Sequence, residues 1–144
     1  MKSLKYKQPE SNKQILIASE PEVLYARATK DINFSIDAFE NLQQNIPFSQ
    51  IEWADILHIN TRTLQRYIKD NKAFEGLYAE HLHQILNMSK LGLSIFKTPD
   101  NLKEWLITPK HILGNTLDFN SLKSFWGVKL ISNELGRITY GVYI

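Results

Sequence analysis

The sequence predicts an all-α fold, and three observations support that prediction. Apolar residues recur at helical spacing in several stretches, as with Ile36, Phe39 and Leu42. Residues that favour helix N-caps precede most of these stretches, whereas alternating strand patterns are weak. With 144 residues, of which 43% are hydrophobic and 22% charged, the chain has the length and composition of one globular domain.

Helix boundaries follow from capping residues and helix breakers. The segment from Ser19 to Glu22 has the pattern of a capping box with Pro21 in the first turn, which predicts a helix over about 20–30. Pro47 and Pro109 are expected to stop the helices before them, and Gly141 to end the last one. The other predicted helices cover about 35–45, 49–57, 60–70, 76–97, 99–107 and 127–138. Residues 14–18 form either a short strand or the start of a helix.

The spacing also predicts which side chains are buried. In the helix over 76–97, one stripe at helical spacing contains Tyr78, Leu82, Ile85, Leu86, Leu93 and Phe96. The last helix is expected to bury Val128, Ile131, Leu135 and Ile138. Trp105 is expected in the core beside Leu102 and Leu106, and Gly127 at the entry to the last helix.

Several classes of protein and site are disfavoured. The chain has no cysteine, which removes disulfides, cysteine-based zinc sites and thiol catalysis. His81 and His83 are two residues apart on a predicted helix and point in opposite directions, so they cannot share a metal ion. With no phosphate-binding or nucleophile motif either, we expect no enzymatic activity, no metal and no cofactor. No apolar run reaches the ~18 residues of a membrane span and the start of the chain lacks a signal peptide, so we expect a cytoplasmic protein.

The charge distribution is uneven although the net charge is only +2. Residues 31–57 carry five acids and no lysine or arginine. Residues 58–72 carry four bases, Arg62, Arg66, Lys69 and Lys72, against the single acid Asp70. The net charge is too small to argue for nucleic acid by itself, but it hides an acidic block followed by a compact basic one.

Residues 50–69 have the pattern of a helix–turn–helix motif. Ala54 is small enough for the two helices to touch, and the side chains expected to face the core are Trp53, Leu57, Ile59, Leu64 and Ile68. On the opposite side of the second helix, three cations fall within ~60° of one another. These cations and their polar neighbours are the candidate DNA-binding residues: Thr61, Arg62, Thr63, Gln65, Arg66, Lys69 and Lys72.

Two features of this segment favour the alternative of a plain helical hairpin with a solvated basic face. His58 occupies the turn position that usually holds glycine. Glu52 and Asp55 point outward from the first helix, which in this motif crosses the phosphate backbone of DNA.

The C-terminal half, together with this motif, resembles a known family. Thr61 to Arg66 is similar to the helix–turn–helix of Xre/MbcA/ParS-type antitoxins. The toxin-binding domain of that family is resembled by Trp105-Leu106, Pro109, Leu113-Gly114, Leu122, Gly127-Val128, Leu135, Arg137-Ile138 and Tyr140-Gly141-Val142. At Asp118 the chain departs from the family, which has a proline there.

The resemblance implies an antitoxin of a type II (RES–Xre) toxin–antitoxin system. Such a protein binds a toxin encoded beside it, usually a RES-domain enzyme that depletes NAD⁺, and its C-terminal end blocks the toxin's active site. The helix–turn–helix would bind operator DNA and repress transcription of its own operon. The fold implied is an Xre-like helix–turn–helix unit followed by a small helical toxin-binding domain.

The chain end is unusually apolar for a terminus, which supports a partner that covers it. The candidate toxin-binding residues are Arg137, Tyr140, Gly141, Val142, Tyr143 and Ile144. Arg137 is offset from the buried stripe and is expected to reach acidic groups of the partner. Packing of this end against the protein's own helices is the alternative.

The sequence is thus interpreted as an antitoxin that also binds DNA, in a homodimer or larger toxin–antitoxin assembly. Residues 1–34 form an N-terminal segment of unassigned role, 35–97 the helix–turn–helix unit with a long helix, and 98–144 the toxin-binding domain. Two alternatives stay open. One is a stand-alone helix–turn–helix regulator whose C-terminal half only dimerises. The other is a pure toxin inhibitor with a vestigial motif, which the acidic block at 31–57 favours.

Overall fold

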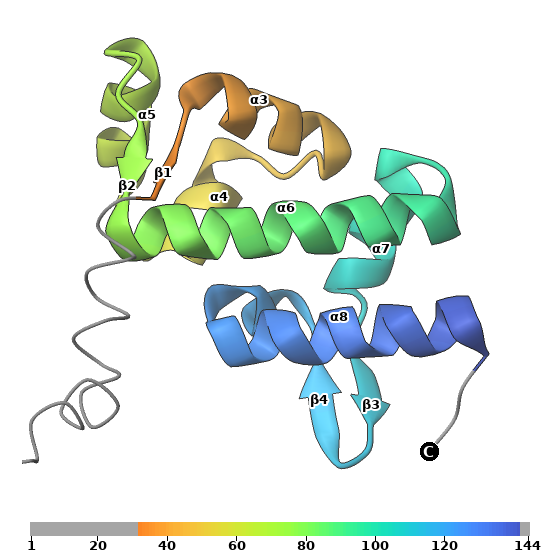
Figure 1. The fold of residues 1–144 in the computed structure, drawn as a ribbon. Coiled ribbons are helices and arrows are strands. Elements are labelled where there is room, and N and C mark those ends of the chain that lie inside the picture. The colour runs from red at the N-terminus through yellow and green to blue at the C-terminus, as the bar shows by residue number, and fades with distance from the viewer. Residues whose placement is uncertain (1–31, 142–144) are drawn as a thin grey trace, which may run out of the picture.

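The computed structural model describes residues 32–141, which form an all-α fold with two small antiparallel strand pairs. The long helix α6 (Gly76–Phe96) lies in the middle (Figure 1). On one side of it are α3 (Ile36–Asn45), α4 (Gln50–Leu57) and α5 (Thr61–Lys69). On the other side are α7 (Pro99–Ile107), the 3-10 helix η1 (Phe119–Lys123) and α8 (Phe125–Tyr140).

The helices begin where capping side chains satisfy their first amide groups. Ser35 accepts a hydrogen bond from the amide of Ala38 at 3.0 Å, and Asn60 accepts one from the amide of Thr63 at 2.8 Å. The predicted helices over 35–45, 49–57, 60–70, 76–97 and 99–107 are confirmed as α3 to α7. The last helix begins two residues earlier than predicted, because Ser124 caps it. The strand or helix start predicted over 14–18 and the helix predicted over 20–30 lie outside the described residues.

The strand pairs were not predicted. β1 (Asn33–Phe34) pairs with β2 (Phe74–Glu75), and β3 (Lys110–Ile112) pairs with β4 (Asn115–Leu117), both antiparallel. Each strand is two or three residues long, too short to show the alternation of apolar and polar residues by which strands are recognised. Between α7 and η1 the chain forms the β3–β4 hairpin.

One hydrophobic core joins both halves of the described chain. Its buried members include the predicted Leu82, Ile85, Val128, Ile131 and Leu135, as well as Leu102 and Leu106. Leu86, Leu93 and Phe96 are only half-buried at its edge.

Two predictions of burial are wrong, and that for Trp105 holds only in part, because this residue packs against the core from its edge. Ile138 is exposed, because it lies in the last turn of α8, past Leu135. Tyr78 is exposed beside a cavity at the start of α6. Trp105 is half-buried, with its ring 5.3 Å from that of Phe96 and 4.1 Å from the Nζ of Lys110.

Candidate functional site

The helix pair α4–α5 presents the predicted basic surface. Leu64 is fully buried and Ile68 half-buried, so one side of α5 packs on the core. On the other side, Arg62, Gln65, Arg66 and Lys69 are all exposed. Within residues 32–141, the side chains of the three cations among them have no hydrogen bond or ion pair. We call these four residues the α5 basic face; its charges are available to a ligand.

The other candidate DNA-binding residues lie at the ends of α5. Thr61 and Thr63 are half-buried in its first turn, where the amide of Thr63 bonds to Asn60. Lys72 is exposed after the helix, with its Nζ 4.7 Å from the ring centre of Tyr67. Tyr67 in turn stacks on Phe74 at 5.1 Å. The structure thus brings Lys72 close to α5 but holds its ammonium over an aromatic ring rather than within the α5 basic face.

The turn between α4 and α5 takes the backbone conformation that usually requires glycine. His58 has φ 61°, in the left-handed region, and ends α4. Histidine is one of the non-glycine residues found there most often. Its Nε2 is 2.7 Å from the carbonyl oxygen of Lys123 in η1, a hydrogen bond in which the ring N–H donates. The side chain therefore fastens the turn to the C-terminal half.

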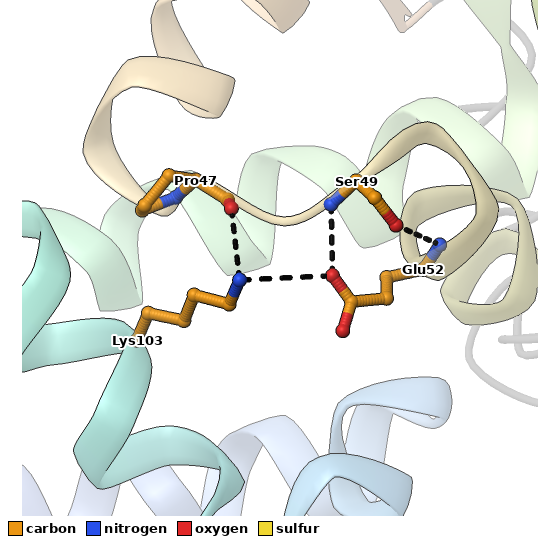
Figure 2. Close-up of polar contacts among 4 residues, drawn as sticks. All are labelled: Pro47, Ser49, Glu52 and Lys103. Atoms are coloured by element: carbon orange, nitrogen blue, oxygen red, sulfur yellow. Dashed lines mark hydrogen bonds and ion pairs between the residues drawn. The ribbon is translucent and has the colours of Figure 1, made fainter.

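The acidic side chains of α4 lie against lysines of the C-terminal half. An Oε1–Nζ distance of 3.9 Å joins Glu52 to Lys103, and Figure 2 shows that the same lysine donates a hydrogen bond of 3.2 Å to the carbonyl of Pro47. Glu52 also completes the capping box with Ser49. Asp55 pairs with Lys123 at 3.1 Å. The two carboxylates thus face cations of the chain itself, which reduces their repulsion of a nearby phosphate.

The C-terminal segment that was predicted to bind the partner agrees only in part with that prediction. Arg137 does not extend alone into solvent, because its Nη2 is 2.8 Å from Oε1 of Glu134, one turn earlier on α8. Tyr140 is 77% exposed, and Gly141 ends the helix with φ 66°. The candidate residues Val142, Tyr143 and Ile144 lie outside the described part of the chain.

Two exposed apolar side chains of the C-terminal half were not predicted. The tip of the β3–β4 hairpin carries Leu113, which is 68% exposed, and the first turn of α8 carries Trp126, which is 63% exposed. No sequence signal marked this hairpin, because a leucine stands where two-residue turns favour asparagine, aspartate or glycine.

A cavity lies at the junction of the two halves. It has a volume of about 290 Å³ and is lined by side chains of α4, α6 and the η1–α8 junction, among them His58, His81 and Phe125. His81 is buried and donates through Nε2 to the carbonyl of Leu122 at 2.8 Å. Burial lowers the pKa of its imidazole, an effect larger than that of the hydrogen bond, which raises it.

No group of three or more His, Asp or Glu side chains among residues 32–141 is placed to hold a metal ion. In the same range, no helix has the length and apolar character needed to cross a bilayer. Comparison of the chain with protein-family models and with curated proteins finds no match.

Proposed function

We propose that the chain is an Xre-type antitoxin that binds operator DNA through the α5 basic face and neutralises a partner toxin with its C-terminal half. The observation that carries the proposal is the separation of two different surfaces by α6 (Figure 1). Cations without a protein partner cover one side of α5. On the other side of α6, exposed apolar side chains cluster on the hairpin and α8.

The α5 basic face has the composition expected of a DNA-reading helix. Arginine and glutamine side chains can form paired hydrogen bonds with base edges in the major groove, while lysines contact phosphates. The lysine partners of Glu52 and Asp55 support this interpretation over a vestigial motif, because they offset the acidic charge that argued against DNA.

For the C-terminal half, the family resemblance supports a toxin of the NAD⁺-depleting RES class encoded beside this chain. The test is to express the neighbouring reading frame with and without this chain, and to follow growth and cellular NAD⁺. The proposal predicts that the neighbour alone stops growth and lowers NAD⁺, and that this chain restores both. A neighbour that is harmless and does not co-purify with the chain would contradict the antitoxin function.

A stand-alone regulator is the second candidate, favoured by the exposed apolar residues of α8 if a second copy of the chain covers them. The chain end separates the two candidates. Deletion of residues 140–144 should abolish neutralisation of the neighbour while DNA binding persists, because the end of α8, from which they follow, lies across α6 from α5. Loss of dimerisation and of DNA binding in the deletion variant would favour the regulator instead.

A further inference from the structure

The β3–β4 hairpin ends in a turn that its sequence does not favour. Leu113 and Gly114, the two residues of the turn, have φ 51° and φ 84°. Two-residue turns with two positive φ angles favour Asn-Gly, because asparagine and glycine tolerate the left-handed region. A leucine there carries backbone strain, because its Cβ crowds the following carbonyl oxygen in the left-handed region. Since Leu113 is also 68% exposed, burial in the core does not repay that strain.

The hairpin packs against one side of α8. A small cavity of about 80 Å³ lies between the two elements, and Leu130, Asn133, Glu134 and Arg137 line its α8 side. Ile112 and Leu113 line it from the hairpin. These contacts establish which side of α8 faces the hairpin.

Two exposed aromatic residues, Trp126 and Tyr140, lie on that side of α8. At about 100° per residue, five positions of α8 fall within about 80° of one another: Trp126, Leu130, Asn133, Arg137 and Tyr140. Along α8, Trp126 lies before the residues that face the hairpin, and Tyr140 lies after them. They are 63% and 77% exposed, and 14 residues of helix separate them by roughly 21 Å.

Lys129 is the cation on this surface that is available to a ligand, because it is exposed beside Trp126, with its Nζ 5.9 Å from that ring. Lys110 is half-buried at the base of the hairpin, where its Nζ donates hydrogen bonds to the carbonyls of Trp105 and Thr108. Glu134, which lines the cavity beside the five positions, is paired with Arg137. A protein partner that fits here would offer apolar sockets, with a carboxylate that meets Lys129.

We infer that Leu113, Trp126 and Tyr140, which we call the hairpin face, form the surface that docks the toxin, with Leu113 as its central anchor. The inference rests on the proposed function and extends it, because the sequence assigned partner binding to residues 137–144 alone. Large, exposed apolar side chains around one protruding residue are typical of the few positions that dominate a protein interface. Contact of the Leu113 side chain with the partner, rather than packing within the chain itself, accounts for a strained leucine at this position.

The substitution Leu113→Asn separates the two roles of this residue. Asparagine fits the positive φ better than leucine, so the thermal stability of the free chain should be unchanged or raised. Affinity for the purified neighbouring gene product, measured by titration calorimetry, should fall at least tenfold. Leu113→Gly, which also suits the turn, is a second variant with the same expected result.

The matched control is Ile51→Asn. Ile51 is 69% exposed in the first turn of α4, an element separate from the hairpin and α8, and this variant should bind the partner like the unmodified chain. Equal affinities of the Leu113→Asn chain and the unmodified chain would overturn the inference while leaving the proposed function intact. A change in the oligomeric state of the free chain on Leu113→Asn would also overturn it, because a second copy would then occupy the surface. No binding by the unmodified chain would overturn the proposed function, and the inference with it.

Discussion

Gly127 is the residue at which the fold depends most directly on the lack of a side chain. It lies in the first turn of α8, and a Cβ there would be 1.9 Å from the carbonyl oxygen of Ser121. The sequence pattern indicated a helix entry at this position, but only the structure reveals the close approach of η1. Because Ser121 contributes a backbone atom, it cannot move aside without displacing η1.

Gly127→Ala should therefore lower the free energy of unfolding by about 1–3 kcal/mol, the range seen for overpacked sites. Gly136→Ala is the matched control in the same helix, because its Cβ would meet no heavy atom within 4 Å. That change should raise stability by about 0.5–1 kcal/mol, since alanine favours helix. Urea unfolding measures both, and equal stabilities of the two variants would contradict the close approach.

His81 should make stability depend on pH. Since burial lowers the pKa of its imidazole below the ordinary 6.5, the unfolded chain takes up a proton first as pH falls. The contribution of this residue is therefore complete above about pH 6.5 and is lost as pH drops from there toward the folded-state pKa.

The comparison is between the unmodified chain and His81→Gln, which keeps an N–H donor for the carbonyl of Leu122 but cannot titrate. Chemical unfolding at about pH 7.5 and pH 5.5 should give a larger loss of stability on acidification for the unmodified chain. The same loss in both chains would exclude His81 as its source.

Single residues also mark the limit of prediction from sequence. The face on which Arg137 lies follows from helical spacing, but its ion pair with Glu134 does not, because that depends on rotamers and on the hairpin packed beside them. His58 looked like an obstacle to the turn, since nothing in the sequence indicated that Lys123 would supply a hydrogen-bond partner.

Among the elements, α5 has a proposed role, contact with DNA phosphates, that the charge of its side chains makes measurable. Each phosphate contact made by a lysine or arginine steepens the decrease of DNA affinity with salt. Lys69→Ala should reduce the slope of log affinity against log salt by about one unit per protomer. Lys90→Ala, an exposed lysine of α6 well removed from α5, should leave the slope unchanged. Fluorescence anisotropy at several salt concentrations measures the slope, and no change for Lys69→Ala would argue against a phosphate contact by α5.

Helices were predicted far better than strands, and the reason is local chemistry. Ser35, Ser49, Asn60, Thr98 and Ser124 all cap helices in the structure, and caps can be recognised without knowledge of the fold. Asp118, which stands where the resembled family has a proline, caps η1 by accepting a hydrogen bond from the amide of Asn120. β1 and β2, by contrast, pair across 40 residues of chain, so their two-residue strands depend on tertiary packing.

For the whole molecule, the arrangement around α6 determines what can bind at the same time. The α5 basic face and the hairpin face lie on opposite sides of this helix (Figure 1). The candidate residues of α5 could be identified from the sequence because helical periodicity alone groups them. The hairpin face could be identified only in part, because helical periodicity groups Trp126 with Tyr140 whereas only the tertiary structure brings Leu113 to that side of α8.

The central claim is that DNA and the protein partner bind through these two separate surfaces. The most direct measurement is the binding of the Arg62→Ala/Arg66→Ala double variant to two ligands: DNA from upstream of its own gene, and the neighbouring gene product. Our account predicts that DNA affinity falls at least tenfold, because two arginines leave the groove-facing side, while affinity for the partner is unchanged. Unchanged DNA affinity, or a parallel loss of both activities in a folded variant, would contradict it.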